Sequence, residues 1–384
     1  MQRVERDERR ASLVALHHLN RTGASFAGVA GDIVGLHSSD PASVFLAAWA
    51  RISGFQRDDA EASLYDDRST VRHLGMRRTM FVVPPDLASV VDAACTKALY
   101  PPQRRRVAGL IEKSGISSDG DARITRLSDA TLAALEERGS ATARELTEDV
   151  PELGDRIEYG KGTFGMSTRI LFLLSVEGRI VRGRPNGSWL SSQYQWSTVE
   201  TWLGESFESR DARKARAELL ERWLRVFGPA TELDCKWWTG WNLTDTRAAL
   251  ADIDAETVAL DDETGYRMRS GAVIKPEAGS TCLLPALDPT PMGWKEREWF
   301  LGPHESDLFD RNGNIGPTVW VDGAIVGGWG QSESGSVHVR LLEPVASESS
   351  DRIEAEASAL ETWLDGTVVK PRFPTPLEKR LRAG

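Results

Sequence analysis

His37 and Ser39 lie two residues apart just before a predicted helix, and their side chains have the chemistry to activate water. A neutral imidazole has an unperturbed pKa of ~6.5 and suits a general base near neutral pH. The Ser39 hydroxyl donates or accepts a hydrogen bond, whereas Ser38 points the other way in an extended segment. The residues alone favour a simpler interpretation, in which His37-Ser38-Ser39 is a polar loop and Ser39 caps the helix.

A second set of candidate residues carries the positive charge or polarity that contact with DNA requires. Arg77 and Arg78 lie in a segment rich in strand formers, so we expect them to face opposite sides. In the loop around Arg311 and Asn312, Gly313 permits close backbone approach, although a structural turn held by Asp310 fits the pattern equally well. The predicted DNA-binding residues are Arg72, Arg77, Arg78, Arg179, Arg182, Arg184, Arg311 and Asn312. Each arginine cluster alone is also typical of a solvated surface.

Charge and composition limit the possible partners. The 384-residue chain has a formal net charge of −10, which argues against nonspecific coating of DNA but permits a basic groove. Three distant cysteines and scattered histidines predict no disulfide framework and no metal site, and we expect no cofactor. No apolar run approaches the ~20 residues of a membrane helix, and no secretory signal is visible. We therefore expect a cytoplasmic protein without a membrane partner.

Capping and turn signals predict the elements that position these residues. Asp40-Pro41 starts a helix, with Asp as N-cap and Pro at the first helical position. Helices followed by a strand near 76–83 predict a first, irregular winged helix. A second unit is clearer, because Asn186-Gly187 supplies a hairpin turn after the helices. Its expected parts are helices over 128–138, 140–150 and 167–178, a loop over 151–165, and strands over 179–182 and 189–196.

The remaining sequence predicts a third unit and a different C-terminal domain. A helix over 212–227 precedes Gly228-Pro229, and Thr231 caps a helix on which at most one of Trp237 and Trp238 faces the core. The hairpin around 261–265 has an acidic tip that repels phosphate, so this unit suits a scaffold. From 272 onward, strands, a turn at 322–323, a helix over 352–364 and a basic tail over 370–384 indicate an antiparallel sheet. The fold class is α+β.

Five blocks together resemble the winged-helix DNA glycosylases of the AlkZ/YcaQ family. They occur in the family's order and span nearly the whole chain, so together they are fairly specific. The blocks are Gly35-Leu36-His37-Ser38-Ser39-Asp40-Pro41, Met76-Arg77-Arg78-Thr79, Phe227-Gly228-Pro229-Ala230-Thr231 with Trp237-Trp238, Leu283-Leu284-Pro285-Ala286-Leu287-Asp288-Pro289, and Phe309-Asp310-Arg311-Asn312-Gly313 through Gly327.

The resemblance implies three tandem winged helices and a β-rich C-terminal domain around a C-shaped, concave DNA channel. The expected boundaries are 1–110 with the catalytic-motif segment, 120–205, 210–271 and 272–384. It implies a monofunctional, metal-independent glycosylase that removes N7-alkylated purines, including bulky or crosslinked adducts, from duplex DNA. The family's motif is Gln-x-Gln or Gln-x-Asp, and His37 and Ser39 occupy its two positions here.

The chemistry of N7-alkylated purines makes the altered motif a reasonable catalyst. Alkylation charges the base, which then leaves readily, so the site must mainly stabilise a cationic sugar and position water. A neutral His37 and the Ser39 hydroxyl can do this, whereas a protonated His37 repels the cationic base. The alternatives are a non-catalytic lesion-binding or regulatory protein, and a winged-helix scaffold for proteins. We expect a monomer bound to damaged duplex DNA, with no obligate protein partner.

Overall fold

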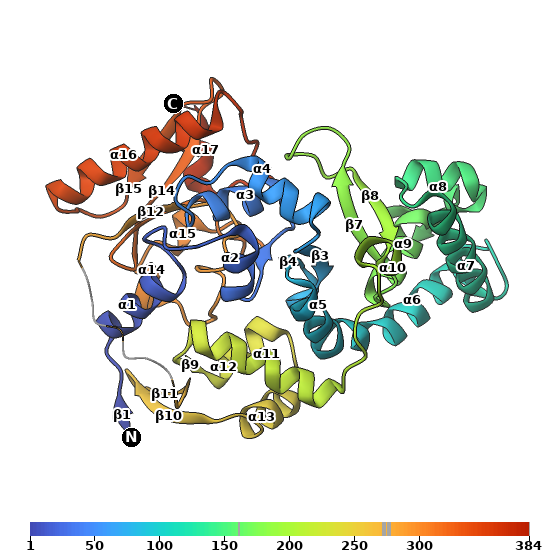
Figure 1. Cartoon of the computed structure of the whole chain (residues 1–384), viewed down its shortest axis with the longest axis horizontal. Helices are drawn as coiled ribbons and strands as arrows, with labels where there is room; N and C mark the ends of the chain where they lie inside the picture. Colours follow the sequence, from blue (N-terminus) through green and yellow to red (C-terminus); the bar gives the residue numbers. More distant parts are fainter. Residues whose placement is uncertain (160–161, 271–273, 275–277, 384) are drawn as a thin grey trace. The chain divides into compact units, whose positions relative to one another are not determined.

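The computed structural model describes residues 1–159, 162–270, 274 and 278–383, and the chain divides into two compact units. Unit 1 consists of Met1–Ala60 and Ala217–Gly384, and unit 2 consists of Glu61–Arg216 (Figure 1). Both units combine helices with strands, which confirms the mixed helix and sheet content predicted from the sequence.

Unit 1 contains two sheets and the helices that cover them. Its N-terminal elements are β1 (Gln2–Arg3), α1 (Arg6–Leu16), α2 (Phe26–Asp32), β2 (Leu36–His37), α3 (Pro41–Trp49) and α4 (Arg57–Glu61). The chain re-enters this unit within α11 (Ala212–Phe227) and continues with β9 (Ala230–Thr231), α12 (Glu232–Thr239), α13 (Leu243–Ala251), β10 (Ala255–Leu260) and β11 (Glu263–Met268). The last elements are β12 (Thr281–Leu284), α14 (Glu298–Leu301), α15 (Glu305–Leu308), β13 (Thr318–Val321), β14 (Ala324–Gln331), β15 (Val337–Leu341), α16 (Ser347–Leu364) and α17 (Pro376–Ala383).

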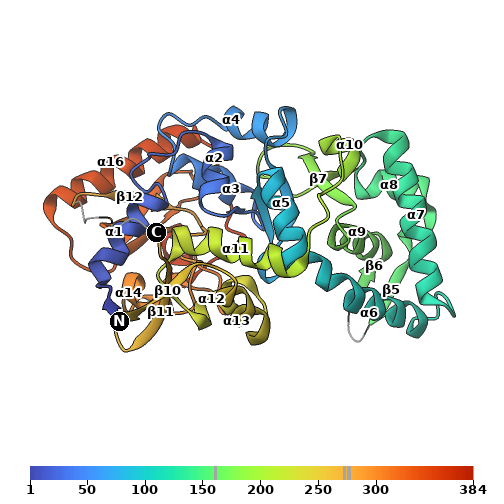
Figure 2. The ribbon, with the colours of Figure 1, turned by 60° about the horizontal axis from the view of Figure 1, so that its bottom comes forward.

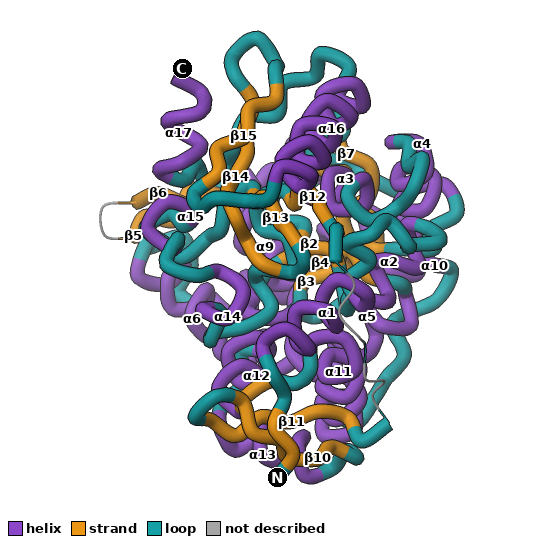
Figure 3. Tube along the Cα trace, turned by 90° about the vertical axis from the view of Figure 1, so that its left-hand side faces the viewer, coloured by secondary structure: helices purple, strands orange, loops and turns teal. Residues whose placement is uncertain are grey.

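The strands of unit 1 pair in the orders β1-β10-β11-β9 and β12-β13-β14-β15. The second sheet is antiparallel throughout, and α16 and α17 flank it (Figure 3). Aromatic rings fill much of the interior, as burial of apolar surface favours. The contacting rings belong to Trp223, Phe227, Trp238, Trp294, Trp299, Phe300 and Trp320. The tryptophan-rich composition therefore mainly serves packing.

Unit 2 joins a sheet to a helical cluster. Its first elements are the π-helix η1 (Ala62–Asp66), β3 (Val71–Leu74), the 3-10 turn η2 (Met76–Arg78), β4 (Met80–Val83), α5 (Pro85–Val91), η3 (Asp92–Thr96) and η4 (Lys97–Leu99). There follow α6 (Tyr100–Lys113), α7 (Gly120–Arg138), α8 (Ala143–Asp149), η5 (Pro151–Gly154), β5 (Arg156–Tyr159), β6 (Gly162–Gly165), α9 (Met166–Val176), β7 (Ile180–Pro185), β8 (Tyr194–Thr198) and α10 (Val199–Leu203).

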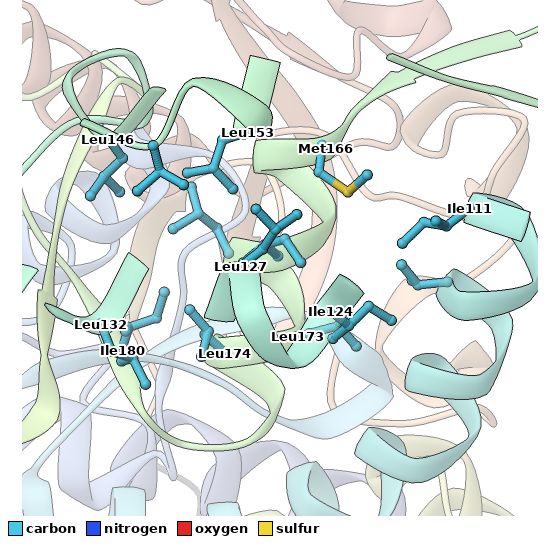
Figure 4. Packing of buried hydrophobic residues seen from close by; sticks show 14 of the residues in the cluster. Ile111, Ile124, Leu127, Leu132, Leu146, Leu153, Met166, Leu173, Leu174 and Ile180 are labelled. Carbon is cyan, nitrogen blue, oxygen red and sulfur yellow. The ribbon is translucent and has the colours of Figure 1, made fainter. Parts of the chain in front are cut away.

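One hydrophobic cluster holds the helical part of unit 2 together. Helices α6, α7, α8 and α9 contribute Ile111, Leu127, Leu146 and Leu173 to it, and all are buried (Figure 4). Ile157 of the hairpin β5–β6 joins the same cluster, which attaches the hairpin to the helices (Figure 2). Strands β4, β3, β7 and β8 are hydrogen-bonded neighbours in that order.

Several local expectations are confirmed. Asp40 caps α3 and Pro41 is its first residue, while α11 spans the expected 212–227. Thr231 caps α12 in a capping box, and Trp238 is buried while Trp237 is only half-buried. Asp322 and Gly323 form the β13–β14 turn with φ of 49° and 77°, the positive values that a tight hairpin requires.

Five other expectations are wrong. Helix α7 begins at Gly120 rather than 128, since the Asp119 side chain accepts a hydrogen bond from the Ala122 N–H. The expected loop over 151–165 contains the hairpin β5–β6. Arg77 and Arg78 lie in a turn rather than a strand, with φ of 52° and 60°. The tail over 370–384 contains α17, and the helix expected from 352 begins at Ser347.

Within the part of the chain that the structure describes, every helix is too short or too polar to span a lipid bilayer.

Candidate functional site

A sharp reversal of the chain after α2 positions the candidate site in unit 1. Val34 and Gly35 have φ of 55° and 111°, and the Gly35 N–H donates to the Ala30 carbonyl at 2.8 Å. Glycine accepts positive φ without a steric penalty, whereas a β-branched valine does not. The positive φ of Val34 is energetically unfavourable and persists only where the surrounding structure holds the backbone in that conformation. His37 follows two residues later, in β2.

The two candidate catalytic residues differ in their exposure. The His37 side chain is 5% exposed and Ser39 is half-buried. Asp40, not Ser39, provides the helix cap, since its carboxylate accepts a hydrogen bond from the Ala42 N–H at 3.2 Å. The Ser39 hydroxyl is therefore not occupied by capping, and the simple capping interpretation of this residue is wrong.

Two distant parts of unit 1 hold this segment in place. Arg372 Nη1 donates to the Ser39 carbonyl at 2.7 Å, and Ser43 Oγ donates to the Ala286 carbonyl at 2.7 Å. Arg51, two residues after the end of α3, is fully buried. It pairs with Asp288 through Nη1–Oδ2 and Nη2–Oδ1 distances of 2.8 and 2.7 Å. The block around 283–289 thus anchors both ends of α3.

A small cavity of about 40 Å³ lies beside the start of α3 and has room for water rather than for a nucleobase. Asp40, Gln331, Glu378 and Arg382 supply its polar lining. Burial raises the pKa of Asp40 above its ordinary value. Burial, assisted by repulsion from Asp40, raises the pKa of Glu378 to about 7. Two carboxyl groups with raised pKa values therefore line this cavity beside the start of α3.

Three predicted DNA-binding arginines of unit 2 gather around two tyrosines. Arg72 and Arg182 are cross-strand partners, and both guanidinium groups lie over the Tyr194 ring, at 5.1 and 5.3 Å from its centroid. Arg184 lies 4.6 Å over the Tyr65 ring. Arg72 is only 2% exposed and donates to the Tyr65 hydroxyl at 2.6 Å.

Carboxylates compensate one of these arginines. Arg184 forms ion pairs with Glu61 and Asp66, so part of its charge is neutralised within unit 2. Arg78 and Arg179 are exposed, and Arg77 is half-buried in the turn before β4. The arginines predicted to bind DNA therefore lie in several different environments, from exposed to buried, and Arg184 among them is paired with carboxylates.

Arg311 and Asn312 are exposed at the tip of a rigid loop in unit 1. The Asp310 carboxylate accepts hydrogen bonds from the backbone N–H groups of Asn312 and Asn314 at 2.8 and 2.9 Å. Burial alone would raise the pKa of Asp310, but the hydrogen bonds from Asn314 and Asn312 outweigh it and lower the pKa. Gly313 has φ of 82°, as this turn requires. The loop is structured and also presents two polar side chains.

Sequence reasoning missed Arg372 and Glu378, which lie near Ser39 and Asp40. Both belong to a segment that reads only as a basic tail, more than 330 residues from the motif. The one local signal is Thr375 followed three residues later by Glu378, which is a capping box. Among the described residues there is no group of three or more side chains that could hold a metal ion.

Comparisons with known proteins identify a family and a similar fold. The family model described as DNA glycosylase AlkZ-like matches residues 30–363. The structure is similar to the Streptomyces sahachiroi DNA glycosylase AlkZ with a TM-score of 0.74 and 18% sequence identity, covering 94% of this chain and 98% of that one. At that identity the likeness supports the fold alone. No curated protein sequence matches the chain. Because the family match covers most of the sequence, the chain belongs to the AlkZ-like DNA glycosylase family.

Proposed function

We propose that this protein is a monofunctional glycosylase that hydrolyses the N-glycosidic bond of N7-alkylated purines, including bulky or crosslinked adducts, in duplex DNA. The observation that carries the proposal is that the family match includes the His37-Ser38-Ser39 segment before α3. Membership of a DNA glycosylase family makes DNA the substrate, and the pre-charged leaving group explains how a glycosylase works without a strong general acid.

His37 and Ser39 act together on one water molecule in this mechanism. Neutral His37 accepts a hydrogen bond from the water and takes its proton as the C–N bond breaks. Ser39 orients the same water, and the oxygen attacks the sugar carbon from which the neutral alkylated base departs. The hydrogen bond from Arg372 to the Ser39 carbonyl supports this role, because it fixes the backbone of the motif.

The predicted winged helices at 1–110, 120–205 and 210–271 and the domain at 272–384 supply the DNA contacts in this proposal. In unit 2, the order α7, α8, α9 and then the hairpin β7–β8 supports the second of these units. Arg78, Arg179 and Arg311 are the exposed basic residues of the predicted set that best suit phosphate contact. Arg72 and Arg182 suit a supporting role, because aromatic rings surround their guanidinium groups.

Release of free base from a duplex containing N7-methylguanine tests the proposal. We expect the wild-type protein to release the base under single-turnover conditions. His37→Ala and Ser39→Ala should slow release by about 10²-fold or more while leaving duplex affinity unchanged, because general-base catalysis contributes on this scale. The same assay with a bulkier N7 adduct measures whether large lesions are accepted.

The double variant His37→Gln/Ser39→Gln provides a matched control, since it restores the amides typical of the family. It should release base, and its rate should lack the decline that the wild type shows below the ~6.5 pKa of an imidazole. A wild-type profile without that decline between pH 5 and 7 would contradict a neutral His37.

One observation favours a second candidate function. His37 is 5% exposed, and the family's amides are replaced, so a protein that recognises lesions without cleaving them also fits. Tight lesion binding without base release would identify such a sensor or regulator. Absence of both binding and release would identify a protein-interaction scaffold.

A further inference from the structure

One small surface of unit 2 combines two like charges with an exposed ring. Arg106 lies on α6, Phe164 on β6, and Arg169 in the first turn and a half of α9; these three residues are called the Phe164 patch. Helix α6 packs against β5 and α9, which brings the three elements together (Figure 2). The guanidinium carbon of Arg169 lies 4.2 Å from the centroid of Phe164, whose side chain is 36% exposed.

The charges of this patch have no carboxylate partner within the described residues. Neither Arg106 nor Arg169 forms an ion pair there, and the buried Arg169 Nε has no hydrogen-bond partner. Burial, followed by repulsion from Arg106, lowers the pKa of Arg169. Helices α6 and α9, which carry the two arginines, pack against each other, and an anion bound at this surface would offset their positive charge.

Six other arginines of the same unit are compensated by carboxylates. Arg104, Arg123, Arg126, Arg138, Arg144 and Arg184 each pair with an aspartate or glutamate. The chain as a whole carries a charge of −10, so its overall field repels a polyanion. A phosphate contact must then come from local positive charge without internal compensation, which the Phe164 patch provides.

The position of Arg169 favours nucleic acid over other anions. Helix α9 is the third helix before the hairpin β7–β8, and helix-turn-helix proteins contact DNA through the N-terminal residues of the corresponding helix. The planar guanidinium group of arginine can donate two hydrogen bonds to phosphate oxygens, and the Phe164 ring holds one guanidinium in place. We propose that the Phe164 patch binds the phosphodiester backbone of duplex DNA. This inference rests on the proposed function and adds a backbone contact outside the predicted set.

Fluorescence anisotropy with an undamaged duplex, measured from 50 to 200 mM salt, tests the inference. Each phosphate contact steepens the dependence of log K on log[salt] by about 0.9. Arg106→Gln/Arg169→Gln should therefore weaken binding by about tenfold or more at low salt and make the slope shallower by about 2. Phe164→Ala should weaken binding with less effect on the slope.

Two control variants make the result specific. Arg138→Gln/Arg144→Gln changes the net charge equally, but both residues are ion-paired with Asp149 and Glu148, so the slope should not change. Arg106→Lys/Arg169→Lys keeps the charge and should keep the slope. Loss of slope in this variant as well would point to damaged folding and contradict a phosphate contact.

The outcomes separate this inference from the proposed function. An unchanged slope in Arg106→Gln/Arg169→Gln, with wild-type binding intact, would overturn the patch alone. Absence of duplex binding by the wild type would overturn the proposed function itself. Loss of binding to vesicles containing phosphatidylserine, with DNA affinity unchanged, would assign the patch to anionic lipid and contradict the inference.

Discussion

The Arg51 guanidinium is the most deeply buried charge next to the motif helix. It bonds to Asp288, Thr290 and the carbonyls of His17 and Ala47. Asp288→Asn leaves this charge uncompensated, so we predict a loss of about 3–5 kcal/mol in the free energy of unfolding by urea. Arg51→Met/Asp288→Leu should cost much less, because it removes both charges. Equal losses in the two variants would contradict this account.

His17 predicts a pH dependence of stability. Burial, with a further effect from Arg51, lowers its pKa to about 3. The unfolded state therefore binds a proton below ~6.5 while the folded state does not until about pH 3, so this residue destabilises the fold as pH falls through that window. From pH 7 to 5 the loss is about 2 kcal/mol.

The variant His17→Gln isolates this effect. Between pH 7 and 5 its free energy of unfolding should fall by about 2 kcal/mol less than that of the wild type. Glu378, with its raised pKa, acts in the opposite direction in both proteins and cancels in the comparison. Parallel curves for the two proteins would show that His17 is not held neutral by the fold.

The sequence predicts only a basic tail where helix α17 lies. This helix carries Glu378, which lines the cavity beside the start of α3. Leu377 is 2% exposed, and a Cβ on Gly328 of β14 would lie 2.4 Å from its Cδ2. We predict that Leu377→Ala lowers the free energy of urea unfolding by about 2–5 kcal/mol. Leu243→Ala, at a 38% exposed position, should change it by no more than about 0.5 kcal/mol. Similar effects would mean that α17 is not packed as described.

Elements with strong local signals could be predicted, and those that depend on distant partners could not. Asp40-Pro41, Thr231 and Asp322-Gly323 act through neighbouring backbone groups, so their helices and turn lie where the sequence indicates. The hairpin β5–β6 has short strands of four residues each, and β6 begins and ends with glycine, while Ile157 of β5 belongs to the core cluster. Nothing in its local pattern distinguishes it from a loop.

The candidate site was likewise only partly predictable. His37 and Ser39 were found through family blocks, whereas Arg372 and the cavity carboxyl Glu378 reach the motif only after folding. The block around 283–289 has a structural explanation, since Asp288 fixes Arg51 and Ala286 accepts from Ser43. The sequence resemblance therefore pointed to the block around 283–289, but it did not show that this block contacts α3 and Arg51.

At the scale of the whole chain, the fold persists at 18% identity to a solved glycosylase with a TM-score of 0.74. Such a likeness is compatible with a changed motif, because the elements around it depend on packing and capping rather than on the two candidate catalytic side chains. The acidic net charge further implies that DNA contact depends on a few uncompensated arginines and is strongly weakened by salt.

The most direct test is single-turnover release of free base from an N7-methylguanine duplex by the wild type and by His37→Ala/Ser39→Ala, each at saturating protein. The account predicts release by the wild type and a rate at least about 10²-fold lower in the variant, with equal duplex affinity. Equal rates of base release in the two proteins would contradict it.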